Sequence, residues 1–404
     1  MSSEKKIHDR LLTERSQLEE AQAAGVGRTL ATYTRLSGPG WLQSAITLGG
    51  GSLAGSLYLG VIGGYEFLWL QPLMMMLGIV MLSAIAYVTL STGKRPFQAM
   101  NEHVSPVLGW GWLLAAMMAN LVWAMPQFSL GTAALQQNLF PQYLAGDSAK
   151  NICVLCLFLL AAAVVWFYDS PGWGVKIFEL SLKAMVGLVV LSFFGVVVAM
   201  SWKGELDWIS IAKGFVPDFS LLWRPVSGLH SFIDESSDPE FWTATILRAQ
   251  RERMIAAAAT AVGINMTFLL PYSMLRKGWD RAFRGLAAFD LSTGLFIPFL
   301  VATSCVVIAA ASQFHAQFDE RIISQPAADT AGSYRDNLEK RVRAESGSED
   351  RSVLSESEMN AKIDALPSAD RKLAYMLIKR DSLDLATALE NLFGKGGLTQ
   401  KVFG

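Results

Sequence analysis

Four consecutive residues, Gly49-Gly50-Gly51-Ser52, interrupt an apolar segment at a place where its helix should run unbroken. A glycine in a helix interior costs about 1 kcal/mol relative to alanine, and three in a row lie on different helix faces, so helix packing explains them poorly. A break in a membrane-spanning helix frees backbone carbonyl and amide groups, which are tolerated only inside protein or along a cavity. Because freed carbonyls and the Ser52 hydroxyl can ligate a cation, we expect a substrate site at Gly49, Gly51 and Ser52.

A second irregular stretch lies further along the chain, at Val262–Tyr272. It combines Gly263, Asn265, Thr267 and Pro271, and the proline lacks a backbone N–H and frees the carbonyl of Thr267. Interrupted helices at corresponding positions of two structural repeats are a strong sequence indication of a transporter site. We therefore expect Asn265 and Thr267 to contribute to the same site as the glycines.

A few other polar residues lie within the apolar segments. Thr47 precedes the glycine run, and Asn120 and Gln127 could line a cavity from the third segment. Asp290 lies near the start of the last apolar segment, close to Arg284. Since polar and ionisable residues inside a membrane are usually functional, Thr47, Gln127 and Asp290 are candidates for an ion or proton path, and a structural ion pair is an equal alternative for Asp290.

The composition shows which elements must position these residues. The chain has 404 residues, of which 52% are hydrophobic and only 17% are charged, whereas an ordinary globular domain is about 25% charged. The expected fold class is an all-α polytopic membrane protein with interrupted helices 1 and 6. Seven segments approach the length of about 20 apolar residues that a bilayer requires: Trp41–Ile62, Phe67–Leu90, Val107–Leu135, Ile152–Phe167, Ile177–Ser201, Ile255–Leu275 and Leu286–Ala311.

The positive charges of the short loops predict the orientation. If the segments alternate in direction, these charges gather on one side, which is the cytoplasmic side by the positive-inside rule. The N-terminus is then cytoplasmic, in a multi-pass protein of the cell membrane. The basic residues are Arg28, Arg35, Lys94, Arg95, Lys176, Arg276, Lys277, Arg281 and Arg284.

This topology divides the chain into five parts. They are a cytoplasmic segment (1–36), a membrane domain with helices 1–5 (37–201), an extracytoplasmic loop (202–250), helices 6 and 7 (251–312) and a charged extracytoplasmic helical segment (313–404). Because a long outside loop normally leads back into the membrane, we expect the chain to continue beyond Gly404.

Several function classes are excluded. The net charge is −1 and no basic stripe indicates a nucleic-acid partner. The apolar segments contain no HExxH, no GxSxG and no close carboxylate pair. All four histidines lie outside these segments, so the usual general base is absent from them. We expect neither an enzyme nor a bound cofactor.

Several motifs in order resemble the Nramp-type divalent metal ion transporters. They are Gly38-Pro-Gly-Trp-Leu, the glycine-rich break, Gly64-Tyr-Glu-Phe-Leu-Trp69, Thr92-Gly-Lys94 and Trp173-Gly-Val-Lys-Ile-Phe-Glu179. The resemblance extends over roughly Leu36 to Ala311 and implies the LeuT-like fold of two inverted five-helix repeats. It also implies proton-linked uptake of a transition metal such as manganese or iron. This chain offers seven apolar segments for the ten helices of such a fold.

The chain departs from the family at the residues that bind the ion. The family's first-helix signature, Asp-Pro-Gly-Asn, aligns with Gly49 to Ser52, so the carboxylate and the amide are missing. The sixth-helix Met-Pro-His aligns near Thr267, and Met266 supplies the thioether only under a shifted alignment. Neutral oxygen donors suit a hard, hydrated ion such as magnesium better than a bare transition metal. A magnesium-linked branch of the family departs at these same ligands.

The sequence thus predicts a secondary transporter of a magnesium- or manganese-like divalent cation. Its expected binding residues are Gly49, Gly51, Ser52, Asn265, Met266 and Thr267. Two alternatives stay open: a transporter of a non-metal small solute on the same fold, and a membrane scaffold that acts through its outside segment.

Overall fold

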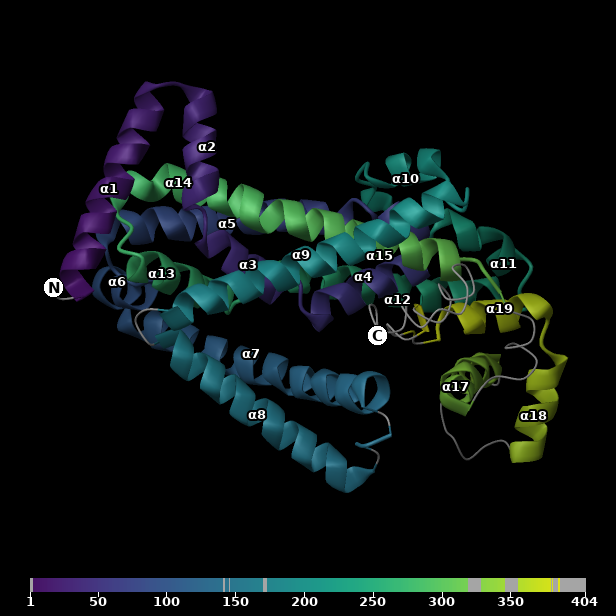
Figure 1. Cartoon of the computed structure of the whole chain (residues 1–404). Coiled ribbons are helices and arrows are strands. Elements are labelled where there is room, and N and C mark those ends of the chain that lie inside the picture. The colour runs from purple at the N-terminus through teal and green to yellow at the C-terminus, as the bar shows by residue number, and fades with distance from the viewer. Residues whose placement is uncertain are drawn as a thin grey trace. The chain divides into compact units, whose positions relative to one another are not determined.

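The protein is a series of helices, which Figure 1 shows in chain order. The computed structural model describes residues 3–140, 142–144, 146–169, 173–318, 328–345, 355–378, 380, 384 and 385, and contains no β-strand within these ranges. The chain divides into two compact units. The first comprises Met1–Ser52, Pro72–Ser192 and Ala259–Ala302, and the second Leu53–Gln71, Phe193–Ala258 and Thr303–Gly404.

Helices that lie wholly or mainly in the first unit form the N-terminal hairpin and most of the apolar spans. They are α1 (Ser3–Ala23), α2 (Val26–Leu36), α3 (Pro39–Thr47), α5 (Leu70–Thr92), α6 (Pro96–His103), α7 (Pro106–Ala133), the π-helical turn η2 (Ala134–Leu139), α8 (Asp147–Asp169), α9 (Trp173–Trp202), α13 (Met266–Arg276), η5 (Arg281–Phe283), α14 (Arg284–Asp290) and the π-helical turn η6 (Leu291–Phe296).

Helices that lie wholly or mainly in the second unit include most of the short and charged ones. They are α4 (Gly50–Gly63), η1 (Gly64–Phe67), α10 (Trp208–Gly214), η3 (Phe219–Leu222), η4 (Ser227–Leu229), α11 (His230–Asp234), α12 (Pro239–Ala261), α15 (Ile297–Phe314), α17 (Ala328–Glu345), α18 (Glu356–Ala365) and α19 (Ser368–Met376).

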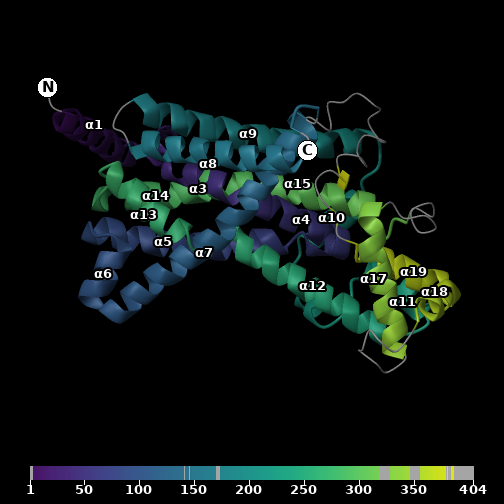
Figure 2. The ribbon, with the colours of Figure 1, turned by 90° about the horizontal axis from the view of Figure 1, so that it is seen from below.

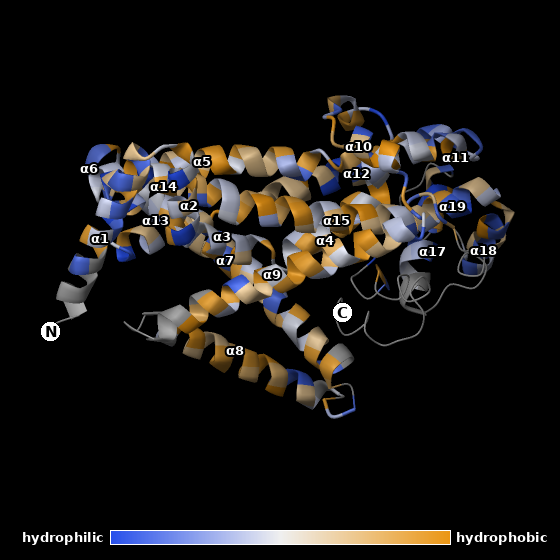
Figure 3. Cartoon of the chain, turned by 45° about the horizontal axis from the view of Figure 1, so that its top comes forward, coloured by the Kyte–Doolittle hydropathy of each residue, from blue (hydrophilic) through white to orange (hydrophobic). Residues whose placement is uncertain are grey.

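Six helices of the described residues are long and apolar enough to cross a membrane, and α3 with α4 makes a seventh if this bent pair is one span. Each of the seven predicted segments coincides with one of these spans, so an all-α polytopic fold with an interrupted first span is confirmed. Figure 3 shows the difference in hydropathy between the apolar α8 and the hydrophilic α11 and α18.

Proline and small residues determine where several helices begin. Pro39, Pro96, Pro106 and Pro239 each stand at the start of a helix. Proline suits this position because the first N–H groups of a helix have no partner within the helix and its φ is already helical. Three of these prolines begin the helices that carry the cavity described below.

Helix α12 begins at Pro239, within the predicted extracytoplasmic loop 202–250 and well before the predicted start of the sixth span at Ile255. The last part of that predicted loop is therefore helical. The Asp238 side chain accepts a hydrogen bond from the Phe241 amide at 3.0 Å and so caps the helix start. The first turns of α12 give no apolar signal in the sequence, because Arg248 and the charged residues that follow it lower the mean hydropathy of the helix.

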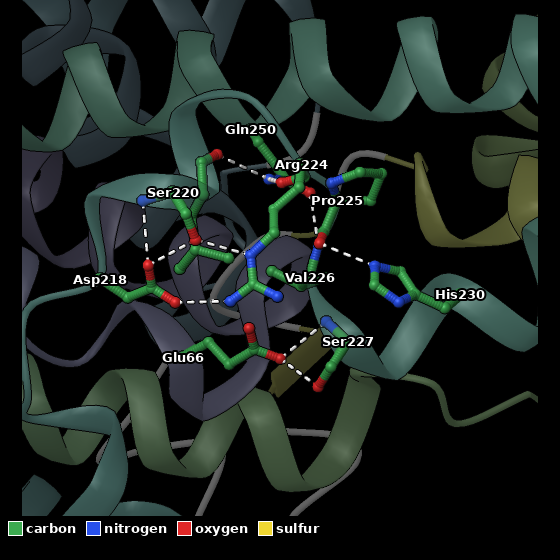
Figure 4. Close-up of polar contacts among 10 residues, drawn as sticks. Glu66, Asp218, Ser220, Arg224, Pro225, Val226, Ser227, His230 and Gln250 are labelled. Atoms are coloured by element: carbon green, nitrogen blue, oxygen red, sulfur yellow. Dashed lines mark hydrogen bonds and ion pairs between the residues drawn. The ribbon is translucent and has the colours of Figure 1, made fainter.

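The remainder of this segment is held together by polar contacts within the second unit, shown in Figure 4. Gln250 of α12 is fully buried, and its side chain accepts a hydrogen bond from the Val226 amide at 3.0 Å. Asp218 pairs with Arg224 at 2.7 Å. The Glu66 carboxylate of η1 accepts hydrogen bonds from the amide, at 2.8 Å, and the hydroxyl of Ser227. Glu66, which is half-buried, therefore ties this segment to η1.

The hydrophobic core of the second unit joins α4, α9 and α15. Leu57, Val61, Met200 and Val306 are among its buried members. Gly60 permits the close approach of α4 and α15, because a Cβ there would lie 2.5 Å from the Val307 carbonyl oxygen. This is the packing role that small residues play between membrane helices.

The segment 313–404 is helical where the structure describes it, as predicted, in α17, α18 and α19. The carboxylate of Asp370 in α19 accepts hydrogen bonds from the Ser237 amide at 2.8 Å and from Trp242 Nε1 of α12 at 2.8 Å. Arg341 of α17 is almost completely buried and lies 3.6 Å from the same carboxylate. Residues 386–404 of this predicted segment lie outside the described part of the chain.

Candidate functional site

The glycine run interrupts the first span, as predicted. Helix α3 ends at Thr47 and α4 begins at Gly50, with Leu48 and Gly49 between them. The hydroxyl of Ser52 reaches back across the break to the carbonyl of Thr47 and to the carbonyl of Gly49, the latter at 3.1 Å. Ser52 therefore satisfies backbone groups that the break frees.

The second break lies between α12, which ends at Ala261, and α13, which begins at Met266. The chain turns at Gly263, whose carbonyl accepts a hydrogen bond from the Met266 amide at 3.0 Å. Pro271, which we expected to contribute to the break, instead lies inside α13, which continues to Arg276. The helix loses one backbone hydrogen bond at the proline, and its interruption occurs upstream, at the glycine.

The two breaks and one face of α7 enclose a cavity of about 400 Å³ in the first unit. Of the nine residues predicted for the site or the path, seven line this cavity: Thr47, Gly49, Gly51, Ser52, Gln127, Asn265 and Met266. The other two are not among its lining residues. The Thr267 hydroxyl turns away to the carbonyl of Ile264, and Asp290 lies elsewhere in the unit.

Met266 and Thr47 join the two breaks directly. The Thr47 hydroxyl lies 3.4 Å from the thioether sulfur of Met266, and both side chains are buried. In the sequence, Met266 matches the family's methionine only under a shifted alignment. In the structure, its sulfur lies in the cavity wall. It is the soft donor of a set that otherwise consists of neutral oxygen and nitrogen atoms.

No histidine, cysteine or carboxylate lines the cavity. Across the described residues no cluster of three or more such side chains could hold a metal ion. The cavity can offer backbone carbonyls, hydroxyls, amides and one thioether. Such a set can replace part of the hydration shell of an ion but cannot neutralise its charge.

The face of α7 that lines the cavity includes a residue that the sequence analysis missed. Asn120 and Gln127 line it as expected, and Trp123 lies between them. A Cβ placed on Gly51 would lie 3.2 Å from the Trp123 ring, so this wall is tight. The spacing 120, 123 and 127 is that of one helix face, and extending the pattern from the two amides would have found the tryptophan.

Comparison with known proteins agrees with this architecture. The sequence model of the natural resistance-associated macrophage protein-like (Nramp) family matches residues 40–331 of the 404. The chain belongs to the Nramp family. Membership, together with the helical spans, supports the predicted fold class, the LeuT-like fold with interrupted helices 1 and 6.

One curated relative is "Metal transporter Nramp6.2" of Populus trichocarpa, 28% identical over 160 residues, which are 39% of this chain and 27% of that protein. Among solved structures, the manganese transporter of Eremococcus coleocola in a complex with an aromatic bis-isothiourea substituted compound is 16% identical with a TM-score of 0.46, and the match covers 93% of this chain and 65% of that chain. A mutant of the same transporter is 16% identical with a TM-score of 0.49, and that match covers 92% of this chain and 69% of that chain.

In this Nramp chain, the stretch Gly49–Ser52, which the resemblance places at the family's Asp-Pro-Gly-Asn, lies at the first break. A Cβ on Gly49 would meet only the Ile46 carbonyl oxygen, at 3.4 Å. The position therefore has room for a side chain. The missing carboxylate is a feature of the sequence that the local backbone does not require.

Asp290 of this Nramp chain holds the start of α3. Its buried carboxylate accepts hydrogen bonds from the amides of Gly38, at 3.1 Å, and Gly40, at 2.6 Å, and from the Ser37 hydroxyl. A carboxylate is well suited to the positive end of a helix dipole. Arg284, the expected ion-pair partner, instead lies over the Tyr87 ring at 4.5 Å.

Gly40 makes this contact possible. A Cβ on Gly40 would collide with the backbone carbonyl of Asp290, so α3 and the last turn of α14 can meet only at a glycine. The Gly-Pro-Gly motif thus has a structural explanation: Gly38 and Gly40 supply the amides for Asp290, and Pro39 starts the helix between them.

Proposed function

We propose that this protein carries a divalent cation across the membrane through the cavity between its two interrupted helices, and that the cation is magnesium-like and keeps much of its hydration shell. The observation that carries the proposal is the convergence of both breaks on one cavity with no charged side chain in its wall. Family membership supports transport of a divalent metal, and the relative's printed name describes a metal transporter.

The absence of a carboxylate from the cavity wall favours a hydrated ion. Removing a divalent cation from water into a protein interior is very costly unless charge is compensated. Magnesium loses its waters reluctantly and usually keeps several of them. Six waters at about 30 Å³ each occupy about 180 Å³, which the cavity of about 400 Å³ accommodates.

Met266 bears on the choice between metals. A thioether prefers soft ions and would favour manganese or iron over magnesium. In this cavity the sulfur lies 3.4 Å from the Thr47 hydroxyl, which also donates to the Gln43 carbonyl at 2.9 Å. We infer that Met266 joins the two half-helices and that the oxygen donors of Gly49, Ser52 and Asn265 face the hydrated ion.

We further propose the orientation and the coupling that the sequence predicts. The N-terminus is cytoplasmic and the protein lies in the cell membrane, because the basic loop residues gather on one side under the positive-inside rule. Family resemblance favours a proton as the coupling ion. A pH-sensitive dye inside proteoliposomes would report whether protons accompany the metal.

The experiment is uptake by proteoliposomes containing the purified protein. Magnesium and manganese are measured separately with fluorescent indicators for each ion. The test variant is Gly51→Ala, whose new Cβ would press on the Trp123 ring at 3.2 Å. The matched control is Gly187→Ala, because a Cβ at Gly187 of α9 meets nothing within 4 Å.

We expect magnesium uptake that saturates, that Gly51→Ala reduces and that Gly187→Ala leaves unchanged. Manganese uptake in preference to magnesium would overturn the hydrated-ion proposal but keep metal transport. No uptake of either ion, with a folded protein, would reject metal transport. Since a neutral cavity also suits an uncharged solute, that result would favour a non-metal solute.

A further inference from the structure

The second unit contains a groove that the proposed pathway does not use. It has a volume of about 810 Å³ and lies between α12 and α17, with Leu377 at one side. Figure 2 shows α12 running into the group of short helices that includes α17 and α19. Apart from its first residues, α17 lies beyond the segment 40–331 that the Nramp model matches.

Each helix presents one face to this groove. On α12 the groove is lined by Phe241, Thr245 and Arg248, which are four and three residues apart. On α17 it is lined by Asn337 and Lys340 at a spacing of three, followed by Arg343 and Ala344. These are the spacings of residues on one side of a helix. The groove is thus built from two regular helix faces.

The charges of the lining residues have one sign. Arg248, Lys340 and Arg343 line the groove, and none of the lining residues that the structure describes is acidic. Arg343 forms an ion pair with Glu339 at 2.8 Å. The same Glu339 carboxylate also pairs with Arg335, at 2.9 Å. One carboxylate therefore serves two arginines, while Asp238, Glu345 and Asp370 lie within 4 Å of the neighbouring Arg341.

The walls of the groove are held in place by buried polar contacts. Trp242 of α12 lies in the wall and donates its indole N–H to Asp370 of α19 at 2.8 Å. Arg341 of α17, one residue from Lys340, lies 3.6 Å from the same carboxylate and within 5.8 Å of the Phe241 ring centroid. Asp370 and Arg341 thereby connect both helices, so the two walls of the groove are held together by buried contacts.

We propose that this groove binds a phosphate-bearing anion. Arginine and lysine are the usual partners of phosphate: the guanidinium donates two parallel hydrogen bonds, and the ammonium acts as a point charge. Three cations on one groove favour an anionic phosphate over a neutral or zwitterionic group. The Thr245 hydroxyl and the Asn337 side chain also line the groove, and the Asn337 amide nitrogen donates to the Ala374 carbonyl at 3.1 Å.

The same chemistry can come from a lipid headgroup or from a soluble phosphorylated molecule. Helix α12 is part of a membrane-spanning segment, so a phospholipid is within reach of its polar end. The volume exceeds that of a single phosphate and would admit either a headgroup or a di- or triphosphate. The experiment has to distinguish these two sources.

The test uses the purified protein in a non-ionic detergent. Sodium tripolyphosphate is titrated by calorimetry, and retention of phosphatidylglycerol against phosphatidylcholine is measured by native mass spectrometry. The variants are Lys340→Gln and Arg343→Gln. The control is Lys362→Gln, an exposed lysine on α18 outside the groove.

Each groove variant should weaken binding about tenfold or more, since a hydrogen bond to a charged group contributes at least that factor. Binding of tripolyphosphate supports a soluble ligand, and selective retention of phosphatidylglycerol supports a lipid. Lys340→Arg should keep the affinity, which separates loss of charge from loss of structure. If neither probe binds, or if Lys362→Gln weakens binding as much as Lys340→Gln, the proposal is overturned.

Discussion

Replacing Gly49 by aspartate should change the ion preference of the cavity. Gly49→Asp introduces a carboxylate at the position where the family carries one, on a residue that lines the cavity. The new Cβ would lie 3.4 Å from the Ile46 carbonyl oxygen, an ordinary contact, and Gly49 is not among the glycines with positive φ. The substitution should therefore be tolerated by the backbone.

The magnitude follows from charge and distance. Two unit charges 4 Å apart attract by about 4 kcal/mol at an effective dielectric constant of 20, so a divalent ion gains about 8 kcal/mol. Burying the carboxylate costs several kcal/mol, which leaves about 1 to 3 kcal/mol, or about 5- to 150-fold in affinity. The gain should be larger for manganese than for magnesium, because magnesium surrenders its waters less readily.

The assay is competition between the two ions for uptake into proteoliposomes, with Gly49→Asn as a control of similar size and no charge. The ratio of half-inhibitory concentrations should move toward manganese in Gly49→Asp and stay near the wild-type value in Gly49→Asn. Equal ratios in all three proteins would refute the idea that the missing carboxylate sets the ion preference.

Three further predictions concern stability. Asp290→Ala should lower the melting temperature more than Asp290→Asn, because it leaves buried donors at the start of α3 without an acceptor at about 1–3 kcal/mol each; equal melting temperatures would contradict the capping role. Gly60→Ala should destabilise the protein by about 1–3 kcal/mol through overpacking against α15, while Gly187→Ala, in open space, should have little effect in the same melting experiment. Burial lowers the pKa of His315 below its usual 6.5, against the opposing effects of a backbone carbonyl and of Glu66. The unfolded chain therefore takes up a proton first, so stability should fall as pH drops from about 7.5 to about 5.5; a His315→Gln variant with the same pH dependence would argue against this.

Much of the membrane architecture was predictable from sequence, because length and hydropathy are physical requirements of a bilayer span. The glycine run also revealed the first break, since no packing role accounts for three consecutive glycines. The start of α12 at Pro239 was missed because its charged turn lies outside the apolar pattern. A helix that extends beyond the apolar region gives no hydropathy signal for its polar end.

The contacts of single polar residues were harder to predict. Asp290 and Gly40 are 250 residues apart in the chain, and Glu66 and Ser227 are 161 apart. Nothing local distinguishes a carboxylate that caps a distant helix from one in an ion path, since both are buried and polar. Thr267, which was predicted to bind the substrate, does not line the cavity for a related reason. Its hydroxyl donates to the nearby Ile264 carbonyl, and a threonine near a helix start can always form such a local bond.

The loss of the carboxylate and the gain of glycine at position 49 act in the same direction. A bare transition metal needs negative charge within the site, whereas a hydrated ion needs space for its waters. Exchanging aspartate for glycine removes the charge and opens room for about one or two waters of about 30 Å³ each. A Cβ on Gly49 would meet only the Ile46 carbonyl oxygen, whereas a Cβ on Gly51 would lie 3.2 Å from the Trp123 ring. On the proposed function, a glycine in place of the aspartate that the resemblance implies would favour a larger, hydrated ion on both electrostatic and steric grounds.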